Sequence, residues 1–523
     1  MVHEGPVNGA AGSSEGADMV VVANRLPVDR AVDRDGGVSW TTSPGGLVTA
    51  LRPVLESSQG SWVGWPGTTA DSPDEEGTAA EMPEMEGGVT LVPVNLTTEE
   101  FRTYYEGFSN DTLWPLYHDV IVHPEFHRSW WRAYRAVNRR FALAAAEAAA
   151  PGATVWVQDY QLHLVPGILR ELRPDLKIGF FLHIPFPAPE LFRQLPWRWE
   201  VLQGTLGADL IGLHTPDSAW NFLYTLRALG ADVTFSKVGA GDACGTDGAE
   251  GTDEEGVAYI RGARLPRRDA VAGTVRSTDA DGRVREVKVG VFPISIDSSG
   301  VKATADRPET IAAATALRRR VGSPGILLAG VDRLDYTKGI LQRLRALEQL
   351  LDRGQLDPDD VCLVQVATPS RERIESYQKT RNDVELAVSR INGRHGSLGH
   401  TVVHYTHAGL PFNEVVSLYS AADVMLVTAL KDGMNLVAKE YVASHSDGSG
   451  ALVLSEFTGA ATQLPEAYLC NPYDVESTAA AIMQAIESPE EDRRRRMTGM
   501  WDEVRTHDVH GWAQRFLDVL GQA

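Results

Sequence analysis

The stretch Ala422–Ala443, ADVMLVTALKDGMNLVAKEYVA, decides the fold. Its first part, Asp423–Thr428, is apolar and contains β-branched residues, which predicts a buried strand. The residues that follow, Ala429–Met434, include Gly433 and predict a turn. Asn435 is a favourable N-cap, and the apolar side chains after it recur at helical spacing. The stretch therefore predicts a strand, a loop and a helix in succession.

A loop that joins a strand to a helix places free backbone N–H groups and the positive end of the helix dipole at the carboxyl edge of the sheet. Such an edge suits a phosphate or a diphosphate. Asp432 and Glu440 flank it. A carboxylate does not bind phosphate, so we expect these two acids to bind hydroxyl groups of a sugar or a ribose. An ordinary strand–loop–helix unit with surface acids explains this segment equally well.

The bulk properties limit the classes of function. The length of 523 residues predicts two domains. A formal net charge of −21 argues against a general nucleic-acid or anionic-membrane binder, so a phosphate site must be built locally from a few Arg and Lys. The 3 cysteines form neither a metal-binding spacing nor a disulfide framework, as in a reducing compartment. Without a signal-peptide pattern or a long apolar run, we expect a cytoplasmic protein.

Three apolar runs in the first half of the chain predict strands: Thr154–Val157, Ile178–Leu182 and Leu206–Leu213. Helical stretches separate them, which predicts a parallel sheet. Ligands bind beyond the carboxyl ends of such strands. Asp159 and His183 lie at two of these ends and are therefore candidate site residues. Taken singly, each is as compatible with a structural role as with a functional one.

Weaker signals lie nearer the N-terminus. A strand over Met19–Ala23 leads to Arg25, and Gly46 ends a Gly-Gly pair before a helical run. Adjacent glycines allow a phosphate to approach the backbone, but most such pairs are turns, and Arg25 is more often a surface residue. Most aromatic side chains near Tyr105 and Trp114 are expected in the core; at a cleft rim such a ring holds a sugar by stacking.

The second half carries two cations in one predicted loop. A strand over Gly325–Val331 is followed by Arg333 and Lys338, and then by a helix from Ile340. Two cations beside a helix N-terminus in an acidic protein indicate a diphosphate site. The alternative is two solvated charges.

The motifs VVVANRLPV, SPGGL, WVGWPG, VQDYQLHLVP, FFLHIPFP, GVDRLDYTKG, ATPSRE and LKDGMNLVAKEYVA occur in this order between about Met19 and Pro472. Together they resemble the trehalose-6-phosphate synthases, which are retaining glycosyltransferases of family 20. So many motifs in order are far more specific than a lone glycine pattern. The resemblance implies an α/β protein of the GT-B fold, in which two Rossmann-like domains with parallel sheets face an interdomain cleft.

The resemblance also implies the reaction. Glucose would pass from a nucleotide diphosphate glucose to glucose 6-phosphate with retention, giving α,α-trehalose 6-phosphate and the nucleoside diphosphate, without a metal ion or a cofactor. The base of the donor stays open among UDP, GDP and ADP, with UDP-glucose the commoner family choice and GDP-glucose used by some members. No nucleic-acid or membrane partner is expected, and the oligomeric state stays open, with a dimer or a tetramer as candidates.

Residue roles follow from the resemblance. The catalytic set would be Arg333, Lys338, Asp432 and His183, with the two cations stabilising the leaving diphosphate. The donor-binding set would be Gly46, Arg333, Lys338, Val366, Asp432, Gly433, Met434, Asn435, Leu436, Val437 and Glu440. The acceptor-binding set would be Arg25, Tyr105, Trp114, Asp159 and Arg371. Retention usually suggests a carboxylate nucleophile; the family instead implies a front-face mechanism, in which the departing phosphate takes the proton of the acceptor.

The expected domains are a disordered tail (1–17), an acceptor-binding domain (18–297), a nucleotide-sugar-binding domain (298–487) and a C-terminal helix returning to the first domain (488–523). The acidic stretch Gly239–Gly256 and its continuation to Gly282 are expected to be loop insertions. Ser488–Glu491 shows a capping-box pattern, and Arg493–Arg496 reads as a solvated helix face.

Three other functions compete. A relative with another acceptor, such as glycerol 3-phosphate, is disfavoured because the whole acceptor set is present. A catalytically silent sugar-phosphate sensor should have lost a donor residue, and none is missing. A nucleotide-dependent oxidoreductase is disfavoured because no Gly-x-Gly-x-x-Gly follows the first strand.

Overall fold

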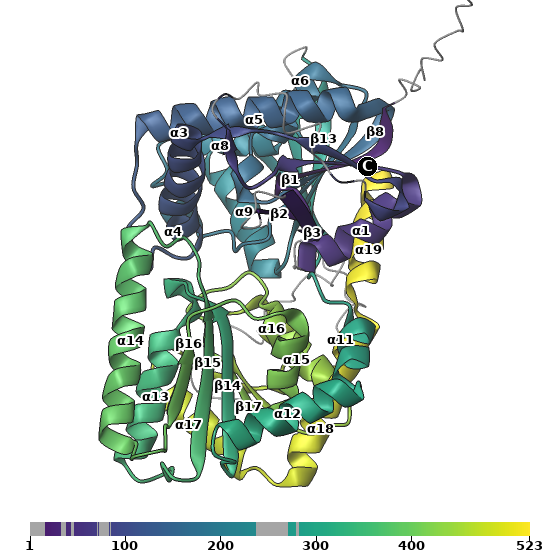
Figure 1. Cartoon of the computed structure of the whole chain (residues 1–523). Coiled ribbons are helices and arrows are strands. Elements are labelled where there is room, and N and C mark those ends of the chain that lie inside the picture. The colour runs from purple at the N-terminus through teal and green to yellow at the C-terminus, as the bar shows by residue number, and fades with distance from the viewer. Residues whose placement is uncertain are drawn as a thin grey trace, which may run out of the picture.

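The computed structural model describes residues 16–32, 38–42, 46–70, 72, 83, 85–236, 270–278 and 282–522. These residues build two large sheets, one from each half of the chain, with helices packed around both (Figure 1). The predictions for Gly239–Gly256, and for most of the tail 1–17, lie outside the described residues. Among the described residues, no helix is both long enough and apolar enough to cross a membrane.

The first sheet has the strand order β11-β12-β13-β10-β9-β8-β1-β4-β6. The pairs from β13 to β6 are parallel, whereas β12 is antiparallel to both of its neighbours. The strands are β1 (Ala17–Arg25), β4 (Ser61–Trp65), β6 (Thr90–Pro93), β8 (Ala149–Gln158), β9 (Lys177–Phe181), β10 (Leu210–Leu213), β11 (Asp232–Phe235), β12 (Ala270–Thr278) and β13 (Val284–Val291).

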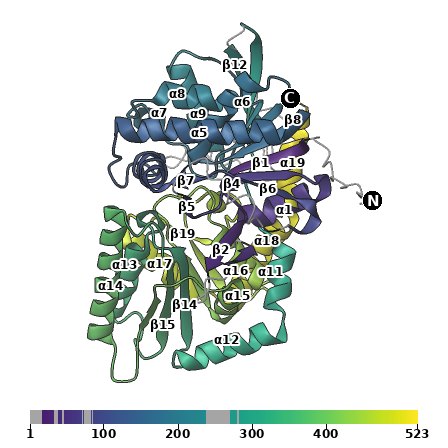
Figure 2. The same ribbon diagram turned by 45° about the horizontal axis from the view of Figure 1, so that its top comes forward.

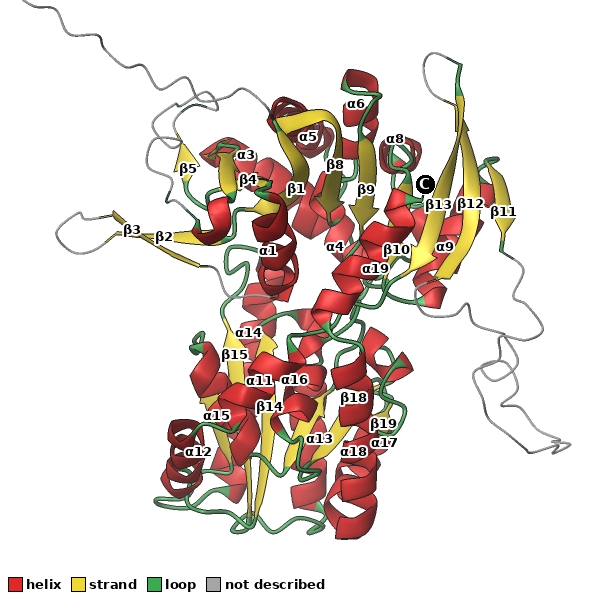
Figure 3. Ribbon diagram, turned by 90° about the vertical axis from the view of Figure 1, so that its right-hand side faces the viewer, coloured by secondary structure: helices red, strands yellow, loops and turns green. Residues whose placement is uncertain are grey.

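Helices cover both faces of this sheet, which is why its central strands contain continuous apolar runs rather than an alternation of apolar and polar residues. In β1, Val20 and Val22 face one layer, and Val21 faces the other. The first layer contains η2 (Phe101–Leu113, a helix of π type), α4 (Trp114–Tyr117), α5 (Arg128–Ala148), α6 (Val165–Leu172), α8 (Arg198–Thr205) and α9 (Pro216–Ala228). The second layer contains α1 (Gly46–Ser58) and α19 (Val509–Gly521), which lie side by side (Figures 2 and 3).

The second sheet is entirely parallel, in the order β16-β15-β14-β17-β18-β19. Its strands are β14 (Ile326–Arg333), β15 (Val361–Thr368), β16 (Val403–Thr406), β17 (Val424–Val427), β18 (Ala451–Ser455) and β19 (Tyr468–Cys470). One face is covered by α13 (Ile340–Asp352), α14 (Glu375–His395) and α17 (Val475–Glu487). The other is covered by α11 (Ser298–Ala305), α12 (Pro308–Arg320), α15 (Phe412–Ala421), α16 (Leu436–Ser444) and α18 (Glu490–Thr506).

The last helix, α19, packs against the first sheet. The Phe516 ring in α19 stacks on Trp156 of β8 at a centroid distance of 4.4 Å, and the Trp512 indole N–H donates to the Phe292 carbonyl at 3.1 Å. The buried side of α19 is formed by Val509, Trp512, Ala513, Phe516 and Leu520. It continues the apolar cluster of the first sheet into that of the second.

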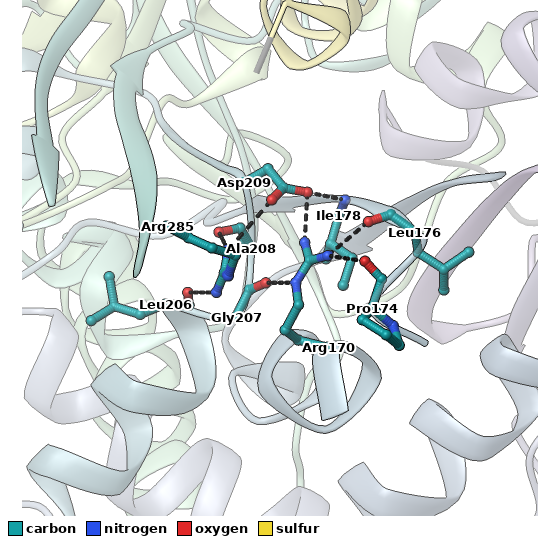
Figure 4. Close-up of polar contacts among 9 residues, drawn as sticks. All are labelled: Arg170, Pro174, Leu176, Ile178, Leu206, Gly207, Ala208, Asp209 and Arg285. Carbon is teal, nitrogen blue, oxygen red and sulfur yellow. Dashed lines mark hydrogen bonds and ion pairs between the residues drawn. The ribbon is translucent and has the colours of Figure 1, made fainter. Parts of the chain in front are cut away.

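One half-buried carboxylate ties together the amino ends of three strands of the first sheet (Figure 4). Asp209 lies just before β10 and accepts the backbone N–H of Ile178 in β9 at 2.8 Å. It also pairs with Arg170, in the last turn of α6, at 2.7 Å, and with Arg285 of β13 at 3.4 Å. A single side chain therefore holds three strands and a helix in register.

The second sheet repeats this device. Asp423, just before β17, accepts the backbone N–H of Leu327 in β14 at 2.7 Å. It pairs with Arg318, in the last turn of α12, at 2.8 Å. In both halves the arginine belongs to the helix that precedes the neighbouring strand, so the two sheets share one local construction.

Three local predictions are wrong. Ala270–Thr278 is not loop but β12, which pairs antiparallel with β13 and buries Ala272 and Val275. The strand predicted over Leu206–Leu213 begins only at Leu210, after a turn.

The third error concerns the capping box at Ser488. The α18 helix begins after Pro489 without a side-chain cap, and the Ser488 hydroxyl donates back to the Gln484 carbonyl at 2.6 Å. The solvated helix face predicted at Arg493–Arg496 is confirmed for three of its four arginines, which pair with Glu490 or Asp492 on the same helix.

Candidate active site

The loop between β17 and α16 has the predicted form. Asn435 is the N-cap of α16, and its side-chain oxygen accepts the backbone N–H of Ala438 at 3.2 Å. Leu436 and Val437 form the first turn, where helix N–H groups have no intrahelical acceptor. Met434 is buried before the cap. The loop thus presents a helix N-terminus at the carboxyl edge of the second sheet.

Asp432 in this loop pairs with a lysine from another loop. The Lys338 ammonium lies 2.6 Å from the Asp432 carboxylate, and the Asn435 amide donates to the same oxygen at 3.1 Å. Burial alone would raise the pKa of Asp432, but Lys338 holds it below the ordinary value. The carboxylate therefore stays ionised and is a weak base.

Lys338 ends the short helix η4 (Tyr336–Lys338), whereas Arg333 is the last residue of β14 rather than part of the loop. Gly339 follows with a φ of 62°. A methyl group there would also overlap the carbonyl oxygen of Thr428 at the end of β17. This glycine lets the loop bearing Lys338 pack directly against the loop bearing Asp432.

Two loops from different sheets touch at Gly433. A methyl group on this residue would overlap the carbonyl oxygen of His183, which follows β9. The carboxyl ends of the central strands of the two sheets thus meet (Figure 3). His183 itself is fixed by neighbours: its backbone N–H donates to Asp159 at 3.0 Å, and its Nε2 lies 2.9 Å from the Gln158 side-chain oxygen.

The two predicted site residues of the first sheet differ in charge behaviour. Burial lowers the pKa of His183 well below its ordinary value, so the imidazole is neutral. Burial raises the pKa of Asp159 to about 6, although the His183 N–H opposes the change. Perturbed groups at a strand's carboxyl edge are typical of functional sites.

Two arginines from the second half of the chain lie over the ring of Trp114. The Arg371 guanidinium lies 4.0 Å from the Trp114 ring centroid, and the Arg333 guanidinium lies 5.4 Å from it. Arg333 is exposed, whereas the Arg371 side chain is only 5% exposed. Arg371 also donates to the Tyr160 hydroxyl at 3.0 Å. Both arginines thus cross from the second half to a tryptophan of the first.

The remaining acceptor candidates surround Trp65. The Arg25 guanidinium lies 5.0 Å from the Trp65 ring centroid, and the Tyr105 ring lies 6.1 Å away. Tyr105 also stacks on Phe101 at 5.3 Å, over which Arg373 of the second half lies at 5.9 Å.

The other donor candidates make fewer contacts with the residues described above. Glu440, on α16, accepts a hydrogen bond from the Tyr419 hydroxyl at 2.9 Å. Val366 is buried near the end of β15. Gly46 begins α1, and its partners in the SPGGL motif, Ser43–Gly45, lie outside the described residues.

Sequence reasoning missed several neighbours. Asp335, Tyr377 and Tyr160 surround Arg371, although two of them lie inside motifs that were recognised. The His118 ring lies tilted against Trp114 at a centroid distance of 4.1 Å, and no local signal in the sequence marks it. Lys431, in the loop between β17 and α16, pairs with Asp119 of the first half at 2.9 Å.

Across the described ranges, no group of three or more His, Cys, Asp or Glu is arranged to hold a metal ion.

A family model, glycosyltransferase family 20, matches residues 17–522. The chain belongs to this family. It is 52% identical over 515 residues to the trehalose-6-phosphate synthase of Mycolicibacterium vanbaalenii, covering 98% of each chain. The family 20 resemblance inferred from the motifs is therefore confirmed, and the chain is a glycosyltransferase.

Solved structures agree on the fold. One is a UDP-forming α,α-trehalose-phosphate synthase from Burkholderia xenovorans in complex with glucose 6-phosphate, at 29% identity and a TM-score of 0.81, covering 96% of this chain and 99% of that one. Another is the E. coli enzyme bound with UDP-2-fluoro glucose, at 30% identity and a TM-score of 0.80, covering 97% and 99%. The predicted α/β architecture of GT-B type is confirmed for this family 20 member.

Proposed function

We propose that the protein transfers glucose from UDP- or GDP-glucose to glucose 6-phosphate and forms α,α-trehalose 6-phosphate. The observation that carries this proposal is the meeting of two sheets at one place. Gly433, in the loop between β17 and α16, contacts His183, and Arg371 lies on Trp114. A donor bound by the second half and an acceptor bound by the first would meet there. The ligands named for the two solved relatives support the same pair of substrates.

The donor would bind the second half. Arg333 and Lys338 would face the diphosphate, with the N–H groups of Leu436 and Val437 at the start of α16. Fixed cations stabilise charge on a leaving diphosphate without having to reorganise during the reaction. Val366 and the backbone at Gly46 would complete the nucleotide contacts.

Hydroxyl groups of the donor would meet the acids. Glu440 would bind the ribose, and Asp432, with the backbone of Gly433 to Asn435, would bind the glucose. His183 would meet the 6-hydroxyl of that glucose, which suits a neutral imidazole able to accept or donate a hydrogen bond.

The acceptor would bind the first half. Arg25, Tyr105 and Arg371 would bind its phosphate, and Trp114 and Asp159 would bind its sugar ring. Two arginines suit a phosphate because guanidinium groups pair with its oxygens through two N–H bonds at once.

The proposed mechanism is front-face and retaining. The departing phosphate accepts the acceptor's proton, and no covalent glycosyl-enzyme forms. The low pKa of Asp432 suits this mechanism, since its Lys338 partner makes it a poor nucleophile and a poor base. We further propose domains 18–297 and 298–487 with a returning segment 488–523, a cytoplasmic location, and catalysis without a metal ion.

The test is product formation from glucose 6-phosphate with UDP-, GDP- and ADP-glucose in parallel, each with and without EDTA. We expect trehalose 6-phosphate from at least one of the first two donors at an EDTA-independent rate, with α,α configuration by NMR. Glycerol 3-phosphate serves as the control acceptor. No disaccharide phosphate from any donor, or a trapped glycosyl-enzyme in mass spectra, would overturn the corresponding part of the proposal.

A further inference from the structure

The orientation of Arg371 depends on polar partners, not on regular backbone structure. The residue lies between β15 and α14 with a φ of 49°, in the left-handed region that residues other than glycine seldom adopt. A long side chain leaving such a loop has many rotamers available. Its guanidinium is nevertheless held over Trp114 at 4.0 Å and bonded to Tyr160 at 3.0 Å.

Tyr377 and Asp335 form the other side of this arrangement. The Tyr377 hydroxyl, in the first turn of α14, accepts an N–H from Arg371 and donates to Asp335 Oδ2 at 3.0 Å. Asp335 is 1% exposed, and its other oxygen accepts the Thr337 backbone N–H at 2.9 Å. Burial raises the pKa of Asp335, but nearby cations, Arg371 first among them, hold it below the ordinary value. The three groups therefore form a row, with the Tyr377 hydroxyl between the Arg371 guanidinium and the Asp335 carboxylate.

The hydroxyl keeps the two charges apart. Arg371 Nη1 and Asp335 Oδ2 are 3.5 Å apart, whereas a direct charge-assisted hydrogen bond is about 2.8 Å long. Without the hydroxyl, the guanidinium is free to close onto Asp335 in a two-bond pair, which is the preferred geometry of arginine and carboxylate. Such a pair would turn its N–H groups away from Trp114.

We propose that Tyr377, anchored by Asp335, is a positioning residue that holds Arg371 off that carboxylate and directs its N–H groups to the phosphate of the acceptor. This inference rests on the proposed function, which assigns Arg371 to that phosphate. A guanidinium has five N–H donors. The bonds to Tyr377 and Tyr160 use one on each terminal nitrogen. The others are available to phosphate oxygens.

The test compares Tyr377→Phe with Tyr468→Phe. The first change removes the spacing hydroxyl; the second removes a buried hydroxyl of the same half that makes no hydrogen bond. We expect Tyr377→Phe to raise the KM for glucose 6-phosphate about tenfold, the effect of losing one hydrogen bond to a charged group. The KM for the nucleotide sugar, kcat and the Tm should stay near wild type, as should every parameter of the control.

A double variant tests the spacing role itself. Asp335→Asn removes the charge that attracts the guanidinium, so Tyr377→Phe combined with Asp335→Asn should bind glucose 6-phosphate more tightly than Tyr377→Phe alone. Calorimetric titration with glucose 6-phosphate measures this without turnover.

Unchanged acceptor affinity in Tyr377→Phe, an equal loss for both substrates, or a weaker double variant would overturn the positioning role. A wild type that binds glucose 6-phosphate but forms no disaccharide phosphate would overturn the proposed function instead.

Discussion

The Lys338 ammonium lies 2.6 Å from the Asp432 carboxylate, and both side chains are largely buried. Their loops are separated by 94 residues in the chain, so this pair joins two parts of the candidate donor site. Each charge is held in place by the other, which makes the pair both a structural and a functional element.

Replacement of Lys338 by Met should therefore affect stability and turnover together. It leaves a buried carboxylate without its cation, which costs about 3 kcal/mol of unfolding free energy, and removes a charge from the leaving group, which lowers kcat by about 10²–10³-fold. Urea unfolding and initial rates measure the two effects. Lys302→Met, which breaks an exposed pair with Asp306, is the control and should change neither by much. A fully stable Lys338→Met enzyme would show that the pair is unimportant for folding.

Asp159→Asn should move stability and activity in opposite directions. The pKa of Asp159 is raised by burial to about 6 in the folded protein, from an ordinary value near 4. An acid with a raised pKa costs folding free energy as the pH rises from about 4 to about 6, and the cost persists above that range. The variant should thus unfold at a higher urea concentration than wild type at pH 7.5 but not at pH 4, while its KM for glucose 6-phosphate rises. A variant less stable at pH 7.5 would contradict this.

Buried neutral histidines should make the protein acid-sensitive. Burial lowers the pKa of His163 and of His214 to about 3, and that of His118 to about 4. Between these values and about 6.5 the unfolded chain binds more protons than the folded one, so stability falls as the pH falls. Each such histidine contributes a slope of about 1.4 kcal/mol per pH unit. Urea unfolding between pH 7 and pH 5 measures the slope, and His163→Gln should reduce it. A slope unaffected by that substitution would count against His163 as a source.

Gly433→Ala should weaken the contact between the two halves. A methyl group there overlaps the His183 carbonyl oxygen, which belongs to backbone and cannot turn aside. We expect kcat to fall by at least about tenfold, because misplaced reacting groups lose rate steeply. Gly393→Ala, on α14 with open space around it, is the matched control and should be neutral or stabilising by up to about 1 kcal/mol. Equal activity of the two variants would argue against close contact at Gly433 during turnover.

Tyr419→Phe should weaken the donor alone. Its hydroxyl is bonded to Glu440 at 2.9 Å, and burial otherwise raises the pKa of that acid. Loss of the bond raises that pKa further and frees the carboxylate to turn, so the KM for the nucleotide sugar should rise about three- to tenfold. The KM for glucose 6-phosphate should not change. Steady-state kinetics with each substrate varied in turn measure both constants. A raised KM for glucose 6-phosphate would contradict the prediction.

Local patterns predicted the parts of this fold that depend on local forces. The strand, loop and helix of Ala422–Ala443 formed as expected. The spacing of the apolar residues and the Asn435 cap are both signals that act within a few residues of the chain. The strand β12 was missed because the sequence between it and its partner, β13, is rich in Asp and Gly, which drew the whole stretch into the loop prediction. The capping box at Ser488 failed because Pro489, whose φ is −54°, takes the place before the helix.

The candidate site was harder to predict because its contacts are distant in sequence. The chain alone shows Lys338 and Asp432 as separate charges, and only the folded backbone brings them together. The same holds for Arg371 and its partner Tyr160, which are 211 residues apart. Motif resemblance supplied Lys338, Asp432 and Arg371, but it gave no indication of which residues hold them in place.

Asp209 and Asp423 fasten the two sheets at the ends opposite to the proposed chemistry. Each half is thus clamped where no substrate would arrive. The loops at the other end are left to shift during a catalytic cycle, or to diverge towards a new nucleotide base or sugar, without loosening the scaffold that carries them.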